Sequence, residues 1–225
     1  MWLSDRHDRV ARSQPPMDAT MEKLILHEDW VSGNCYKIRL TAALLGLPIE
    51  RRQYDIKKGE TRTGDFLANV NANGRIPVLQ IGDKFLPESN AACWYLASRS
   101  PLVPDDRFDQ ADMLRWMFFE QYNHEPNVAT VRFWRAHIGV DQLTDAQRAL
   151  LPAKQAAGEA ALALMDNHLA TRDYFVGPHL TLADICLYAY THVAEEGGFD
   201  LGAYPHVSAW LGRVADRPGY IAIDA

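Results

Sequence analysis

The chain has 225 residues, of which 48% are hydrophobic and 23% are charged, and its formal net charge is −6. This composition is that of an ordinary globular protein, and the length suffices for one large domain or two small ones. The acidic balance argues against nucleic acids and anionic membrane surfaces as partners, because both require a basic face.

The cysteines are few and far apart, at positions 35, 93 and 186. An odd number without neighbouring Cys or His residues matches neither a disulfide framework nor a common metal motif, so we expect a reducing, cytoplasmic environment and no metal. No apolar run is long enough to span a membrane, and residues 1–20 lack the apolar stretch of a signal peptide. We interpret residues 1–20 as a disordered extension; a strand or turn docked on the body is the alternative.

Short apolar runs then alternate with helical patterns. Residues 23–27 and 49–56 are predicted strands, and the segment SGNCYKIRLTAALLGLP between them is a predicted helix. The following patterns predict a short helix (63–71), two strands joined by a tight turn at Gly82-Asp83 (76–81 and 84–86) and a helix (88–99). The expected order is β-α-β-α-β-β-α, with a parallel first pair of strands and an antiparallel last pair.

No strand pattern follows Pro104. Helical periodicity predicts helices over 106–135, 145–170, 180–196 and 207–218. Thr181 and Asp184 have the spacing of a capping box at the start of the third of these. The sequence therefore predicts a small α/β domain over residues 21–100 and an all-helical domain over residues 106–225.

Three motifs in this order resemble the cytosolic glutathione transferase family over about residues 22–220: GRIPVL, ESNAACWYLA and LTLADICLYAY. The segment SGNCYKIRL is similar to the first helix of serine-type, bacterial-like members. The resemblance implies a thioredoxin-like glutathione-binding domain followed by an all-helical domain, and a homodimer. It also implies glutathione as co-substrate.

The resemblance implies how glutathione is held. Pro77 would be a cis proline, and the backbone of Ile76 would pair with the cysteinyl part of the tripeptide. Ser89 would bind the γ-glutamyl carboxylate at a helix N-terminus, and Glu88 would face the γ-glutamyl ammonium. The alternatives are a trans proline at a strand entrance, and Ser89 as a plain N-cap with Glu88 as an acidic residue of the first turn.

Basic residues in the neighbouring loops are candidates for the glycine carboxylate of glutathione. Arg62 and Arg75 are expected there, and Arg75 directly precedes Ile76 and Pro77. A simply solvated side chain is the alternative for each arginine.

Ser32 is the candidate for activating the thiol of glutathione. It sits at the predicted start of the first helix and matches the catalytic serine of serine-type transferases. A hydroxyl donor and a helix N-terminus both stabilise a thiolate. Cys35 is the rival, because SGNC has the spacing of a C-x-x-C motif with Ser in first place; a buried core residue is the other interpretation of Cys35.

Trp116, Phe119 and Tyr122 recur at three-residue spacing and are expected either to line a hydrophobic substrate pocket or to form interdomain core. The predicted function is a glutathione transferase that conjugates the glutathione thiolate to small hydrophobic electrophiles. A glutathione-dependent reductase, lyase or isomerase remains open, as does a non-catalytic glutathione-binding regulatory protein.

Overall fold

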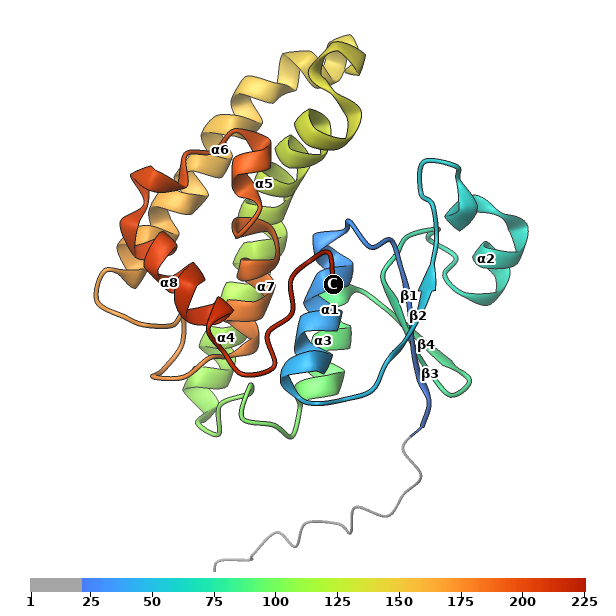
Figure 1. The fold of residues 1–225 in the computed structure, drawn as a ribbon, viewed down its shortest axis with the longest axis horizontal. Helices are drawn as coiled ribbons and strands as arrows, with labels where there is room; N and C mark the ends of the chain where they lie inside the picture. The colour runs from blue at the N-terminus through green and yellow to red at the C-terminus, as the bar shows by residue number, and fades with distance from the viewer. Residues whose placement is uncertain (1–21) are drawn as a thin grey trace, which may run out of the picture.

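The computed structural model describes residues 22–225, so the predicted extension at 1–20 lies outside the described residues. A small sheet with flanking helices forms one end of the molecule, and a group of longer helices forms the other (Figure 1). This architecture confirms the predicted fold, a thioredoxin-like α/β region followed by an all-helical region.

The sheet has four strands in the order β2-β1-β3-β4. Its strands are β1 (Leu24–Glu28), β2 (Glu50–Gln53), β3 (Val78–Ile81) and β4 (Lys84–Pro87). β1 pairs with β2 in parallel and β3 with β4 in antiparallel fashion, which confirms the two predicted pairings. β3 also pairs with β1, in antiparallel fashion. The predicted strand 49–56 is shorter in the structure, because its partner β1 ends at Glu28, which lies opposite Gln53, the last residue of the exposed edge strand β2.

Two helices cover one face of the sheet and separate it from the helical region (Figure 1). They are α1 (Gly33–Leu44) and α3 (Ser89–Ala97), whereas α2 (Gly64–Asn69), preceded by a 3₁₀ turn (Glu60–Arg62), lies on the other side. α1 packs so closely that a Cβ on Gly33 would lie 2.5 Å from the ring of Tyr190. Glycine at this position therefore allows the N-terminus of α1 to approach the helical region.

The helical region consists of five α-helices joined by short irregular helices. The α-helices are α4 (Arg107–Phe119), α5 (Glu125–Arg132), α6 (Asp145–Leu169), α7 (Leu182–Thr191) and α8 (Pro205–Ala215). π-helical turns follow α4 (Glu120–His124) and α5 (Phe133–Ile138), and 3₁₀ turns cover Val140–Gln142, Ala194–Gly197 and Leu201–Ala203. The predicted helix 106–135 is thus two α-helices, α4 and α5, joined by the π turn at Glu120–His124.

The predicted helix 180–196 is too long at both ends. Its regular part begins at Leu182, after the N-cap Thr181, and ends at Thr191, where a short 3₁₀ turn replaces it at 194–197. Gly198 ends this 3₁₀ turn, with a φ of 76° that other residues rarely adopt. The predicted capping box of Thr181 and Asp184 is present.

The last ten residues return to α1, so the final segment touches both regions of the molecule (Figure 1). The Tyr36 hydroxyl donates a hydrogen bond to the Ile221 carbonyl at 2.7 Å, and the Arg39 guanidinium donates to the Ile223 carbonyl at 2.8 Å. Among residues 22–225, none of the helices combines the length and the apolar content that a bilayer crossing requires.

Asp184 generates the first testable prediction. Its buried carboxylate accepts hydrogen bonds from the backbone amides of Phe175 and Thr181, from the Thr181 hydroxyl and from the Trp210 indole, at 2.9–3.0 Å. Asp184→Ala leaves several buried donors without an acceptor, so we expect a loss of about 3 kcal/mol or more in the free energy of unfolding, measured with urea. Thr181→Ala, the control, removes only the cap hydroxyl and is expected to cost about 1 kcal/mol. A loss for Asp184→Ala no larger than that of the control would contradict this account.

Candidate active site

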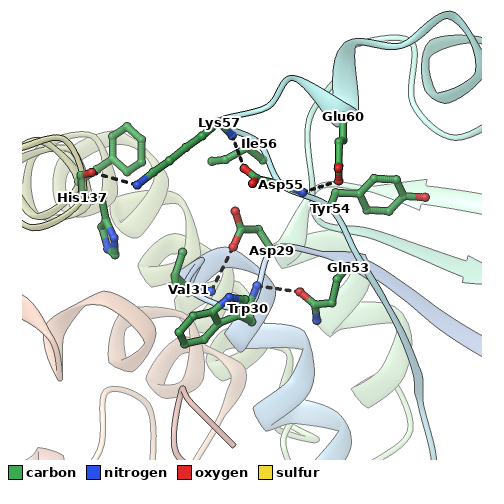
Figure 2. Close-up of a pocket in the computed structure, with 11 residues that line it drawn as sticks. Asp29, Trp30, Val31, Gln53, Tyr54, Asp55, Ile56, Lys57, Glu60 and His137 are labelled. Carbon is green, nitrogen blue, oxygen red and sulfur yellow. Dashed lines mark hydrogen bonds between the residues drawn. The ribbon is translucent and has the colours of Figure 1, made fainter.

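A cleft opens between the loop after β1 and the end of α5. It comprises two adjoining cavities of about 570 and 500 Å³, which share Asp29, Val31, Ile56, Phe133 and His137 in their walls. Figure 2 shows the larger cavity, where the Lys57 ammonium crosses from the α/β region and donates to the His137 carbonyl at 3.1 Å. The cleft therefore has one wall from each region of the molecule.

Ser32 lies in the wall of the 500 Å³ cavity, at the N-cap of α1. Its Oγ accepts a hydrogen bond from the Cys35 amide at 3.4 Å, which leaves the hydroxyl proton available to another acceptor. Buried Arg39 fixes the preceding loop, because its guanidinium donates to the Trp30 carbonyl at 2.8 Å and pairs with buried Glu28 at 3.1 Å. The hydroxyl is thus a fixed donor at the positive end of a helix.

Cys35 faces the interior. Its side chain is fully buried, and burial raises the pKa of its thiol to about 12. A thiol in this state is protonated and shielded from substrates, so the structure favours the core interpretation of Cys35 over a redox role.

The peptide bond between Ile76 and Pro77 is cis, as the resemblance implied. The ladder between β3 and β1 begins only at Val78, so the backbone of Ile76 lies beyond the paired part of the sheet. This is where an extended peptide could add to the sheet.

Glu88 and Ser89 lie at the start of α3, but Glu88 and not Ser89 occupies the N-cap position. Glu88 is the N-cap residue and the only non-glycine residue with positive φ in the described chain, at φ 72°. Ser89 is the first helical residue, so the interpretation of Ser89 as the cap is wrong. A strained backbone of this kind persists only where the surroundings impose it, and it is often found at ligand sites.

The two candidate arginines differ in location. Arg75 is exposed and lines the same 500 Å³ cavity as Ser32. Arg62 lines neither cavity of the cleft; its guanidinium donates to the Asn73 carbonyl at 3.1 Å and packs over Gly74. The structure therefore brings Arg75, but not Arg62, to the cleft.

The expected aromatic pocket does not form. Trp116 is 1% exposed and packs edge-on against Phe119 and Phe175 in the core of the helical region, whereas Tyr122 is 80% exposed. The π turn that follows Phe119 changes the helical phase, so a three-residue spacing no longer keeps Tyr122 on the same face. The prediction of these three residues as a pocket wall is wrong.

Other apolar side chains line the cleft instead. They come from the loop after β1, the loop after β2 and the end of α5: Val31, Ile56, Ala129, Phe133 and Trp134. The adjacent aromatic residues in the sequence VRFWRAHI were the signal that could have indicated this wall.

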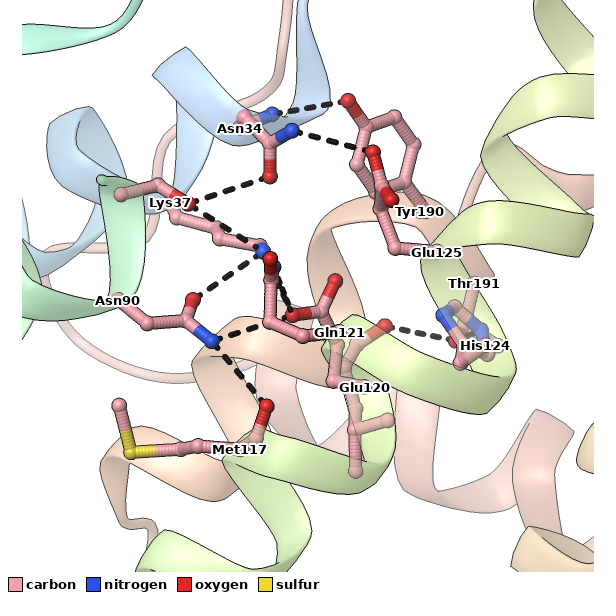
Figure 3. Close-up of polar contacts among 12 residues, drawn as sticks. Asn34, Lys37, Asn90, Met117, Glu120, Gln121, His124, Glu125, Tyr190 and Thr191 are labelled. Carbon is pink, nitrogen blue, oxygen red and sulfur yellow. Dashed lines mark hydrogen bonds and ion pairs between the residues drawn. The ribbon is translucent and has the colours of Figure 1, made fainter. Parts of the chain in front are cut away.

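A buried polar network surrounds the Lys37 ammonium (Figure 3). The Lys37 ammonium on α1 and the Glu120 carboxylate after α4 are both fully buried and form an ion pair at 2.8 Å. Asn90 bridges them, since its Oδ1 accepts from Lys37 and its Nδ2 donates to Glu120, each at 3.2 Å. Burial disfavours the Lys37 ammonium, but Glu120 more than offsets this effect and raises the pKa of Lys37.

Asn34 connects this network to the cleft. Its Oδ1 accepts from the Ser89 hydroxyl at 3.2 Å, and its Nδ2 donates to the Glu125 carboxylate at 3.3 Å. Its backbone amide donates to the Tyr190 hydroxyl at 3.2 Å. Glu125 and Tyr190 line the 500 Å³ cavity together with Ser32.

Sequence reasoning missed these residues: Asn34, Lys37, Glu120, Glu125 and Tyr190. The available signal was the pair of basic residues, Lys37 and Arg39, on either side of Ile38 in the first helix. Within residues 22–225, no group of three or more His, Cys, Asp or Glu side chains is arranged to hold a metal ion.

Comparison with known proteins places this geometry in context. Residues 23–98 match the family description "Glutathione S-transferase, N-terminal domain", and residues 117–218 match "Glutathione S-transferase, C-terminal domain". The structure of a possible glutathione S-transferase from Rhodopseudomonas palustris is 46% identical, with a TM-score of 0.85 over 90% of each chain.

Two curated relatives carry different names. The glutathione S-transferase-like protein LUC7 of a Fusarium species is 32% identical over 82% of this chain and 85% of its own length. Elongation factor 1-gamma of Prunus avium is 26% identical over 88% of this chain, which spans 47% of that protein. Sequence similarity of this kind therefore extends to a protein not named as an enzyme.

The buried ion pair generates the second prediction. Lys37→Met or Glu120→Met alone leaves a charge buried without its partner, and we expect either change to lower the free energy of unfolding by about 3–5 kcal/mol. The double variant Lys37→Met/Glu120→Met removes both charges and is expected to lose much less than the sum of the single changes. Urea unfolding of all variants gives the coupling energy. Additive losses would mean that the pair is not coupled as the 2.8 Å contact indicates.

Proposed function

This chain belongs to the glutathione S-transferase family, and we propose that it is an enzyme that transfers the glutathione thiolate to small hydrophobic electrophiles. The observation that carries the proposal is the Ser32 hydroxyl, fixed at the N-terminus of α1 and open to a cavity of about 500 Å³. A thiol with a pKa of about 8.5 is mostly protonated near neutral pH. A charge-assisted hydrogen bond from Ser32 together with the helix terminus lowers that pKa.

In this proposal glutathione lies along the α/β region. The backbone of Ile76, beside cis Pro77, pairs with the cysteinyl part of the tripeptide. The γ-glutamyl carboxylate binds at the N-terminus of α3 near Ser89, and exposed Glu88 faces the γ-glutamyl ammonium. Arg75 is the cationic partner for the glycine carboxylate, and Arg62 has only a supporting role in holding the turn at 73–74.

The electrophile occupies the apolar part of the same cleft. Val31, Ile56, Phe133 and Trp134 provide a surface for a hydrophobic molecule next to Ser32. Binding there brings the electrophilic carbon to the thiolate, and proximity of this kind supplies a large part of the rate enhancement in two-substrate reactions.

A non-catalytic glutathione-binding protein is the second candidate, and the similarity to an elongation factor favours it. The two candidates differ in turnover, since both bind glutathione. Retention on immobilised glutathione together with turnover of an aryl halide supports the transferase. Retention without turnover of an aryl halide, an enone or a disulfide supports the second candidate.

We also propose that the protein acts in the cytoplasm as a homodimer. The three cysteines are free and buried, as in proteins of reducing compartments. An apolar cavity of about 470 Å³ lies between α3 and α4, lined by Trp94, Leu114, Met117 and Phe118 and bordered by Glu88. Phe118 is 61% exposed beside it, which suits a surface that a second copy covers.

Ser32 and Cys35 give the third prediction. Ser32→Ala removes the hydroxyl donor, so we expect the apparent pKa of enzyme-bound glutathione to rise and kcat/KM toward an aryl halide to fall about ten- to a hundredfold. Cys35→Ser, the control, changes a buried thiol and is expected to leave the pH–rate profile unchanged. The thiolate absorbance in the ultraviolet measures the pKa directly. Loss of activity in Cys35→Ser with full activity in Ser32→Ala would mean that the chemistry runs through the cysteine.

The proposed dimer gives the fourth prediction. We expect the wild-type protein to sediment as a dimer at micromolar concentration, and Phe118→Ser to shift the equilibrium toward the monomer, because burying a serine in place of a phenylalanine forfeits about 2 kcal/mol of apolar burial. Phe108→Ser, another exposed aromatic on α4, is the matched control. A wild-type monomer at that concentration would refute the dimer.

A further inference from the structure

Glu125 shares the wall of the 500 Å³ cavity with Ser32 and Arg75, and the reaction described above does not use it. Resting on the proposed transferase activity, we propose that Glu125 is a catalytic proton carrier. It takes the thiol proton of glutathione and returns it to the electrophile. The role matters for electrophiles that take up a proton on addition, such as α,β-unsaturated carbonyl compounds, and not for those that release an anion.

The position of Glu125 suits this role. It is the first residue of α5, next to the π turn that ends α4. Asn34 donates to its Oε1 at 3.3 Å and thereby fixes the carboxylate (Figure 3). Among the described residues no other hydrogen bond and no ion pair holds Glu125, so Oε2 is available to a ligand in the cavity.

The electrostatic surroundings favour proton uptake. The charged groups that act on Glu125 are Lys37 and Arg75, which lower its pKa, and Glu120, which raises it. Burial is the largest effect, and the net result is a pKa raised above the usual value despite the hydrogen bond from Asn34. A carboxylate of raised pKa accepts a thiol proton at a smaller free-energy cost than an ordinary one.

The proposed step balances without any further reactant. The thiol proton passes to the Glu125 carboxylate while Ser32 stabilises the thiolate. Sulfur then bonds to the β-carbon of the enone, and the electron pair of the carbon–carbon double bond moves to the carbonyl oxygen as an enolate. Glu125 returns its proton to the α-carbon, which restores the carboxylate and completes the addition of S–H across the double bond.

The reaction of an aryl halide does not require a proton to be returned to carbon. The halide leaves with the bonding electron pair and no atom of the electrophile takes up a proton, so the proton released by the thiol passes on to solvent, with or without Glu125. Removing the proton carrier should therefore affect the two substrate classes unequally.

The test compares an enone, trans-4-phenylbut-3-en-2-one, with an aryl halide, 1-chloro-2,4-dinitrobenzene, in the full-length protein. For Glu125→Gln we expect kcat/KM toward the enone to fall about a hundredfold and that toward the aryl halide to change less than about threefold. Glu125→Asp keeps a carboxyl group and is expected to recover part of the enone rate. Asp29→Asn removes another negative charge from the cleft wall and should leave the ratio of the two rates unchanged.

The outcomes separate this proposal from the transferase activity on which it rests. Equal losses on both substrates, or an undiminished enone rate in Glu125→Gln, overturn the proton carrier while leaving the transferase intact. A wild-type enzyme that turns over the aryl halide but not the enone also overturns the proton carrier, because no addition that needs the returned proton then takes place. A wild-type protein that binds glutathione and turns over neither substrate removes both proposals, and titration calorimetry with glutathione verifies that each variant still binds.

Discussion

The buried ion pair between Lys37 and Glu120 is the constraint on which the arrangement of the site depends. Two fully buried charges are costly to remove from water, and only close pairing with further hydrogen bonds compensates for that cost. The pair and its bridge, Asn90, connect α1, α3 and the turn after α4. The helices that carry Ser32 and Ser89 therefore keep a fixed position relative to the helical region.

This fixed geometry also resolves an electrostatic difficulty. The chain is acidic overall, with a net charge of −6, yet the proposed ligand carries two carboxylates and reacts as a thiolate. The N-termini of α1 and α3 are each positive, and the Asn34–Ser89 hydrogen bond at 3.2 Å shows that they lie close together. Local backbone dipoles thus provide the positive field that the overall charge does not.

Local signals predicted the fold and the backbone features proposed to hold glutathione, whereas contacts between distant segments could not be predicted. The motif around Pro77 and the helix start at Ser89 are contiguous in sequence, so their chemistry is visible there. The partner of Lys37 is Glu120, far along the chain, and nothing in either segment indicates the other. The aromatic prediction failed at Tyr122 because a π turn changes which residues share a helical face.

One wall of the cleft rests on a buried helix and the other on exposed loops and irregular turns, so the two walls differ in how well they tolerate substitution. Ser32 rests on α1, most of which is buried between the sheet and α7, so any change that moves the hydroxyl also disturbs the core. The opposite wall comes from the π turn at 133–138 and the exposed loop after β2, joined by the bond from Lys57 to the His137 carbonyl. Loops and irregular turns tolerate substitution better than a buried helix does. In the proposed transferase, substitutions in that wall would therefore change which electrophile is accepted while the Ser32 hydroxyl stays in place.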